Sequence, residues 1–271
     1  MTRSLVLGGG KPAKWVIHEL NAHQVDFPIF GLKSISREHY EDVPIIDFVD
    51  PADFTRIIRK LSQHKVSSLA LLGTGFSQLT LASLAKSAIV LMRHYTKNSS
   101  SSLNPSIALP YDLFTAVNHY LNEKGIETFG IQDELPHLQP APGSIFGRGK
   151  LSDIQHNLEA IVQFHSTKRK SWRKHGTVKL ADGQFFRQLA GTRGLLKSCY
   201  RRGKDLSRGT LLIEEGEEFK NLDIPIIHED LIQLAITYGL ESIIVKGRNI
   251  VIDEAKLRGM TDSSGLSVYF I

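Results

Sequence analysis

The sequence predicts an α/β protein of two domains, an N-terminal Rossmann-like domain on a parallel sheet and a C-terminal domain with a mixed sheet. The first half alternates short apolar runs with helical patterns, which is typical of parallel sheets. A segment rich in proline and glycine, "ELPHLQPAPG", then interrupts this alternation. The second half begins differently, with a helix and a hairpin. We therefore predict an N-terminal domain at 1–135, a linker at 136–150 and a C-terminal domain at 151–271.

The strands of the first half are predicted from its apolar runs, in the order "SLVLGGG", "FPIFGL", "VPIIDFVD", "SSLALLG" and "IETFGI". Helices are predicted between them at 13–23, at 52–64, after "GTGFSQ" as far as about residue 94, and at 111–125. Pro12 suits a first helical turn, and Asp50 before Pro51 suits an N-cap. The polar tract at 96–106 is predicted to be a loop.

The second half opens with a predicted helix at 152–167. A hairpin follows, turning at Asp182 and Gly183. After it, the order is a basic helix over "LLKSCYRR", a strand "TLLI", a helix "HEDLIQLAITYG" and the strands "SIIVK", "NIVID" and "LSVYFI". Parallel and antiparallel pairs are both expected from this order, so the second sheet is predicted to be mixed.

Composition indicates an ordinary globular protein of 271 residues, 41% hydrophobic and 23% charged. One cysteine, Cys199, excludes an internal disulfide, and we expect it to be a buried thiol. The N-terminus does not resemble a signal peptide, and no apolar stretch is long enough to cross a membrane. We expect a cytoplasmic protein, with peripheral association at the inner membrane as an option.

Basic residues are concentrated in one segment, 168–208, which holds thirteen Lys or Arg against two acids. We expect this basic segment to face one of three surroundings: solvent, an anionic membrane or a phosphorylated substrate. A nucleic-acid-binding module is the weakest option, because no nucleic-acid-binding motif accompanies the charge. The segment 214–230 reverses the balance with seven acids.

Two glycine-rich segments follow predicted strands, and each is a candidate binding loop; they contain Gly8, Gly9, Gly10 and Lys11, and Gly73, Thr74 and Gly75. Bare backbone N–H groups at the start of a helix bind phosphate well. Tight strand-to-helix turns are the alternative reason for these glycines. Gly8, Gly10 and Ala13 also match a dinucleotide fingerprint, but the second strand ends with Lys33 and no acid, so we exclude NAD.

The segments "GGGKPAKWVIHEL", "LLGTG" and "ETFGIQDELPHLQPAPG", together with the last third of the chain, resemble the LpxI-type UDP-2,3-diacylglucosamine pyrophosphatases. The resemblance implies an active site in a cleft between two domains. It also implies Mg²⁺-dependent hydrolysis of a UDP-sugar lipid to UMP and 2,3-diacylglucosamine 1-phosphate in lipid A assembly. The implied partners are that nucleotide-lipid, the inner-membrane surface and a second copy in a homodimer, and no nucleic acid is expected.

The resemblance implies further substrate-binding residues at Asp112, Gly191, Thr192 and Arg193. The chain departs from the family where Ala190 and Arg193 occupy the positions of two acids in an "EGTD"-like motif. Arg193 is either a clamp for an anionic ligand or a surface ion-pairing residue. A relocated catalytic set would use Asp223, with the metal ligands unknown but sought in a cluster of glutamates, Glu214, Glu215, Glu217 and Glu218.

Two functions therefore remain open at this point. One is a metal-dependent pyrophosphate hydrolase whose acidic residues have moved along the chain. The other is a non-catalytic relative that binds a nucleotide or lipid. The acidic cluster is equally compatible with a solvated loop.

Overall fold

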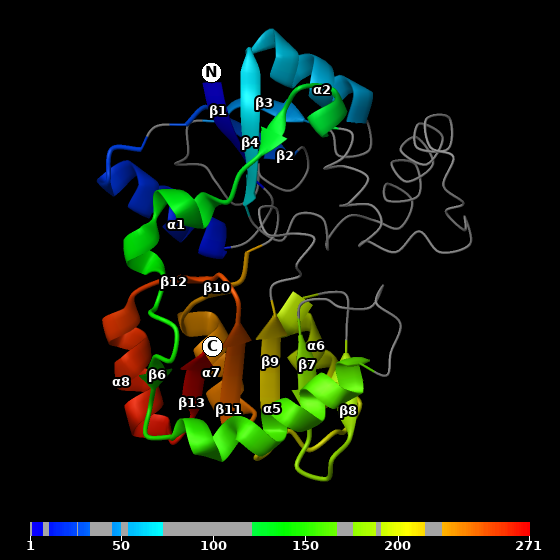
Figure 1. Cartoon of the computed structure of the whole chain (residues 1–271), viewed down its shortest axis with the longest axis vertical. Coiled ribbons are helices and arrows are strands. Elements are labelled where there is room, and N and C mark those ends of the chain that lie inside the picture. Colours follow the sequence, from blue (N-terminus) through cyan, green and yellow to red (C-terminus); the bar gives the residue numbers. More distant parts are fainter. Residues whose placement is uncertain are drawn as a thin grey trace, which may run out of the picture. The chain divides into compact units, whose positions relative to one another are not determined.

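A computed structural model describes residues 2–7, 11–25, 27–32, 45–49, 54–72, 121–166, 176–187, 191–214 and 224–271. The chain divides into two compact units, residues 1–134 with 218–223, and residues 135–217 with 224–271. Each unit is described by itself (Figure 1).

The first unit is built on a five-stranded sheet in which every strand pair is parallel. Its strands, in the spatial order 3-2-1-4-5, are β3 (Ile45–Val49), β2 (Ile29–Leu32), β1 (Thr2–Leu7), β4 (Val66–Leu72) and β5 (Glu127–Thr128). Helices α1 (Lys11–Ala22) and α2 (Phe54–Gln63) and the short η1 (Ile131–Glu134) accompany them. The predicted parallel sheet is confirmed, strand by strand.

Apolar spacing explains how this unit packs. The buried side chains of α1 recur at helical intervals, at Ala13, Val16, Ile17 and Leu20. On the sheet, Leu5, Phe30 and Leu69 are almost fully buried, as central strands of a parallel sheet require. Arg3 forms an ion pair with Glu134 of η1 and lies over the ring of Phe129, so the chain after β5 is fixed to the start of β1.

The second unit is built on a six-stranded sheet in the order β6-β13-β11-β9-β7-β8. These strands are β6 (Ile145–Phe146), β13 (Ser267–Phe270), β11 (Ser242–Lys246), β9 (Thr210–Glu214), β7 (Thr177–Lys179) and β8 (Phe185–Arg187). The three central strands are parallel and the outer pairs are antiparallel, which confirms the predicted mixed sheet. A separate two-stranded pair joins β10 (Ile226–Ile227) to β12 (Ile250–Val251).

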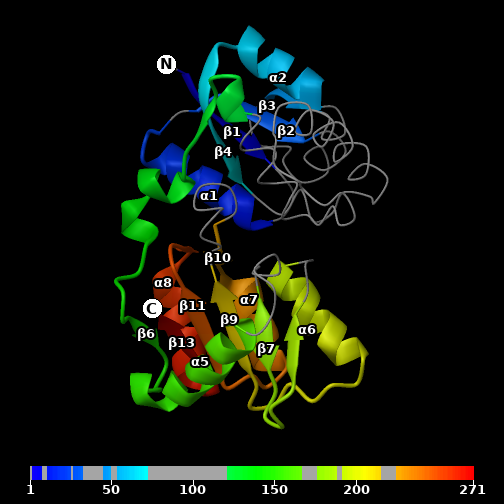
Figure 2. The ribbon, with the colours of Figure 1, turned by 45° about the vertical axis from the view of Figure 1, so that its right-hand side comes forward.

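Helices cover both faces of this second sheet (Figures 1 and 2). One face is covered by α5 (Leu151–Ser166), whose Ile154 and Ile161 pack with Leu212, Ile244 and Tyr269. Side chains alternate along a strand, so the intervening residues face the other way. That face packs against three helices, α6 (Gly191–Arg201), α7 (Glu229–Thr237) and α8 (Glu254–Ser264).

A row of polar side chains crosses the sheet beneath α5. Lys179 Nζ donates to Asn157 Oδ1 at 2.7 Å, and Asn157 Nδ2 donates to Thr210 Oγ1 at 3.0 Å. The hydroxyl groups of Thr210 and Ser242 lie 2.9 Å apart and complete the row. Because each buried polar group in this row has a partner, the row is structural and carries no orphaned donor for a ligand.

The range 136–150, which we expected to be a linker, includes η2 (Pro136–Leu138) and the edge strand β6. Backbone bonds hold it to β13: Gly143 N donates to Phe270 O at 2.7 Å, and Phe270 N donates to Ser144 O at 3.0 Å. Arg258 of α8 lies 4.2 Å above the centre of the Phe146 ring. The proline-rich composition did not reveal these contacts, since the partners lie more than a hundred residues away in the sequence.

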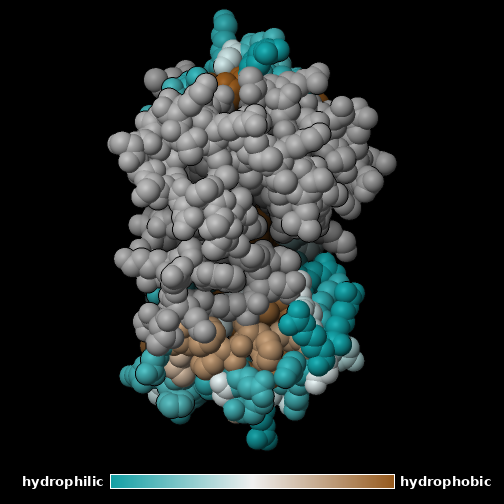
Figure 3. All heavy atoms as spheres, turned by 90° about the vertical axis from the view of Figure 1, so that its right-hand side faces the viewer, coloured by the Kyte–Doolittle hydropathy of each residue, from teal (hydrophilic) through white to brown (hydrophobic). Residues whose placement is uncertain are grey.

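On the side drawn in Figure 3, the visible described residues include one hydrophobic band beside hydrophilic residues. Among the described residues, no helix combines the length and the apolar character that crossing a bilayer requires.

Candidate functional site

The strongest candidate site lies at the carboxyl ends of β1 and β4. Leu7 is the last residue of β1, Leu72 is the last residue of β4, and the two are register partners in the sheet. In the sequence, Gly8 follows directly after Leu7 and Gly73 directly after Leu72. The strand residues that precede the two glycine-rich segments are therefore neighbours in the sheet.

This point is also where the strand order of the sheet reverses. β2 lies on one side of β1 and β4 lies on the other. In parallel α/β sheets, ligands bind beyond the carboxyl ends of the strands at such a reversal, because the connecting chains leave it in opposite directions. Helix α1 begins at Lys11, just after the glycines, and has no acid in its first turn. Its N-terminus therefore favours an anion such as phosphate.

Several predicted site residues lie outside the described part of the chain: Gly8, Gly9, Gly10, Gly73, Thr74, Gly75, Asp112, Ala190, Glu215, Glu217, Glu218 and Asp223. Lys11 is described only as the first residue of α1. Predictions that rest on these side chains stay predictions.

In the second unit, the predicted residues Gly191, Thr192 and Arg193 form the first turn of α6. Arg193 Nη1 lies 3.9 Å from Asp230 Oδ2 in the first turn of α7, and the Arg193 side chain is 61% exposed. An exposed pair at this distance contributes little stability. It does show that the Arg193 guanidinium neighbours a carboxylate.

Glu214, the only described glutamate of the acidic cluster at 214–218, is also next to a cation. It ends β9, and its Oε1 lies 2.8 Å from Nζ of Lys246, its register partner on β11. Magnesium binds near-octahedral sets of oxygen ligands. Glu214 is the one described member of the cluster in which metal ligands were sought, and it is paired with a lysine, so it does not by itself fit a magnesium site.

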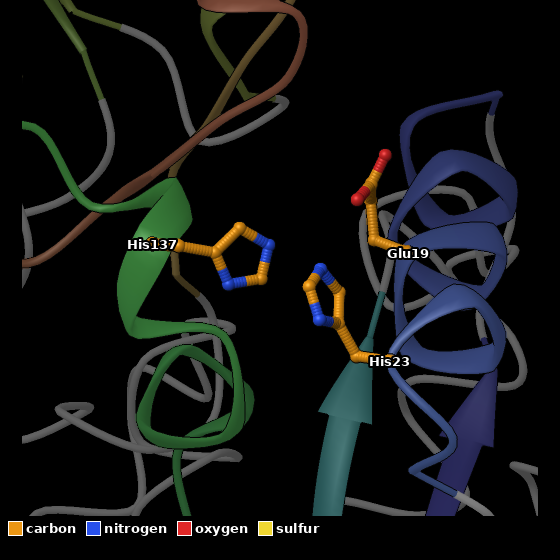
Figure 4. A group of neighbouring side chains, drawn as sticks. All are labelled: Glu19, His23 and His137. Carbon is orange, nitrogen blue, oxygen red and sulfur yellow. The ribbon is translucent and has the colours of Figure 1, made fainter.

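Sequence reasoning missed one pair of potential metal ligands, Glu19 and His23 on α1. The two are four residues apart, and a Glu19 carboxylate oxygen lies within 4.8 Å of a His23 ring nitrogen. Figure 4 draws them with His137, which belongs to η2 of the second unit. The spacing Glu-x-x-x-His was readable in the sequence as one face of a helix. Two ligands from one helix make an incomplete coordination shell.

Cys199 is buried in the core of the second unit, as predicted, with 2% of its surface exposed. Burial raises the pKa of its thiol above the ordinary value, although Arg202 and Lys204 act in the opposite direction. We expect native protein to react with a disulfide reagent at pH 8 at least about tenfold more slowly than urea-unfolded protein, because the thiolate is scarce and covered. The absorbance of released thiolate measures both rates, and equal rates would contradict the expectation.

Comparison of the whole chain with protein-family models and with curated proteins finds no match.

Proposed function

We propose that this protein binds the nucleotide part of a UDP-linked acylated glucosamine at the carboxyl ends of β1 and β4, on a Rossmann-like domain, without hydrolysing it. The observation that carries the proposal is the register pair Leu7 and Leu72: the last residues of the two strands before the glycine-rich segments lie side by side where the strand order reverses. The uridine and lipid parts of the ligand come from the resemblance to LpxI-type pyrophosphatases.

The contacts in the second unit favour binding over hydrolysis. Where the family has an acid, this chain has Arg193, and Asp230 is the carboxylate beside it. Glu214 forms an ion pair with Lys246. An exposed guanidinium suits an anionic ligand, because its planar fork donates to phosphate oxygens. Metal-dependent hydrolysis is the second candidate function. It rests on the resemblance over nearly the whole chain, and it would use Asp223 as the relocated acid.

Calorimetric titration of the full chain with UMP and UDP tests the binding site. We expect saturable binding, and a double variant, Gly8→Val with Gly10→Val, is expected to bind at least about tenfold more weakly, since side chains there keep a phosphate away from the backbone. The matched control is Gly259→Ala in α8, where an added Cβ meets nothing within 4 Å. Unchanged affinity in the double variant, with native circular dichroism, would place the site elsewhere.

The same preparation decides between the two candidate functions. UMP release from UDP-2,3-diacylglucosamine is measured with Mg²⁺, with Mn²⁺ and with a chelator. We expect binding of the nucleotide-lipid without turnover in any of the three conditions. Metal-dependent turnover that is lost in Asp223→Asn would show that the protein is a hydrolase and not a non-catalytic binding protein.

A further inference from the structure

Helix α6 has two chemically different faces. Leu195, Leu196 and Cys199 are buried against the sheet. The opposite face carries Arg193, Lys197, Tyr200 and Arg201, which are spaced so that they form one stripe along the helix. The stripe has no acidic member and contains one aromatic ring.

Contacts at both ends fix α6 beside α7. At their N-terminal ends Arg193 approaches Asp230, and at their C-terminal ends the rings of Tyr200 and Tyr238 stack at 4.8 Å between centroids, with 18° between their planes. The two helices therefore run side by side in the same direction. Despite this stacking, Tyr200 is 62% exposed, the highest value among the exposed large apolar residues of the described chain.

Basic residues lie close to this tyrosine in the sequence. We define the α6 patch as Lys197, Tyr200, Arg201, Arg202 and Arg208. Arg202 follows directly after α6, and the backbone N–H of Arg208 donates to Gly239 O at 2.9 Å, next to Tyr238.

Acids do not neutralise the patch. Within the described ranges, no carboxylate forms an ion pair with any of its four cations. Asp205 accepts from the Ser207 N–H at 2.9 Å, within its own turn. Glu241 is the other nearby acid, since its backbone N–H donates to Gly209 O. Among the described residues that these contacts bring near the patch, four cations stand against two acids, which leaves the patch with a net positive charge.

We propose that the α6 patch is a docking surface for an anionic lipid bilayer. Exposed cations attract anionic headgroups, and a tyrosine with an apolar ring and a polar hydroxyl group suits the boundary between headgroups and acyl chains. The choice of a bilayer over another polyanion rests on the proposed function, because an acylated ligand resides in a membrane. The stripe extends along α6 to Arg193. When α6 lies on the bilayer, its first turn is therefore also near the headgroups.

Vesicle sedimentation of the full chain tests this surface. The probes are vesicles of phosphatidylcholine alone and vesicles with phosphatidylglycerol at about one third. We expect binding to the anionic vesicles only, weakening as salt rises. The triple variant Lys197→Gln, Tyr200→Ser, Arg201→Gln is expected to bind at least about tenfold more weakly, because each cation near a charged bilayer contributes separately.

A matched triple variant in the same unit controls for charge and apolar surface. Arg148, Lys150 and Leu151 are exposed, Leu151 by 50%. The variant Arg148→Gln, Lys150→Gln, Leu151→Ser removes the same number of charges and one apolar side chain, and we expect it to bind vesicles as the natural chain does. Circular dichroism and Cys199 labelling show whether each variant is folded.

Three results would overturn the proposal. They are no binding of the natural chain to anionic vesicles at low salt, an equal loss in both triple variants, or tighter retention on RNA or DNA that disappears in the α6 variant. UMP binding is measured on the same variants. If UMP fails to bind the natural chain while vesicles still bind through α6, the proposed function fails and the docking surface stands.

Discussion

Replacing Gly147 by alanine is expected to lower the free energy of unfolding of the second unit by about 3 kcal/mol or more. Gly147 follows β6 and has a positive φ of 91°. A Cβ added there would lie 2.4 Å from the backbone oxygen of Leu266 and 3.2 Å from the Cα atom of Ser267. Neither backbone atom can move aside without disturbing β13, so the left-handed strain and the overlap act together.

Gly143→Ala is the matched control for this substitution. Gly143 also has a positive φ, 84°, but an added Cβ meets nothing within 4 Å. It should cost only the conformational strain, about 1 kcal/mol. Hydrogen exchange of the β11 and β13 amides, measured by mass spectrometry, gives the loss in the free energy of unfolding for each of the two variants. Equal effects of the two variants would show that residues 143–149 are not held against β13 as described.

These glycines show which parts of the fold a sequence can predict. The strands of the first unit were predicted because each is a short apolar run that ends at a turn, and hydrophobic periodicity is a local signal. The pairing of β6 with β13 is not local, since Phe146 pairs with Val268. Prolines and glycines around residues 136–143 look like a linker because composition does not record which distant strand a segment meets.

Helix α8 was missed for a different reason. Only Leu257 and Thr261 of this helix are buried, and Gly259 lies in its middle, so it has almost no apolar stripe. Its signals are at its ends: Asp253 accepts from the Lys256 N–H at 3.1 Å, and Gly265 follows with a φ of 80°. An N-cap acid and a C-terminal glycine with eleven residues between them predict a helix better than periodicity does here.

The candidate site was predictable in part. The glycines after β1 and β4 were visible in the sequence, but that the strands before them end side by side depends on the strand order, which brings Leu7 beside Leu72. The sequence left the role of Arg193 open between an ion-pairing residue and an anion clamp. Its neighbour Asp230 lies on another helix, and only the packing of α6 beside α7 identifies it.

Phe30→Ala is expected to destabilise the first unit by about 3–5 kcal/mol and to leave the second unit unchanged. Phe30 lies on β2, has no exposed surface, and meets the ring of His64 edge-on at 5.2 Å. Its strand pairs with β1 through Val6 and with β3 through Asp47, so the cavity opens beside the proposed binding site. Faster exchange is therefore expected for the β1, β2 and β4 amides, and not for those of β9 and β11.

Nucleotide affinity should follow this loss of stability. Because UMP is proposed to bind at the ends of β1 and β4, its apparent affinity falls with the fraction of molecules in which these strands are folded. In moderate urea, Phe30→Ala should lose UMP binding while β9 and β11 remain protected. Phe30→Leu keeps most of the buried volume, so this variant should lose UMP binding only at a higher urea concentration. If UMP still binds after the β1 and β4 amides exchange freely, the nucleotide is held elsewhere, because a site formed by strand ends cannot outlast the strands.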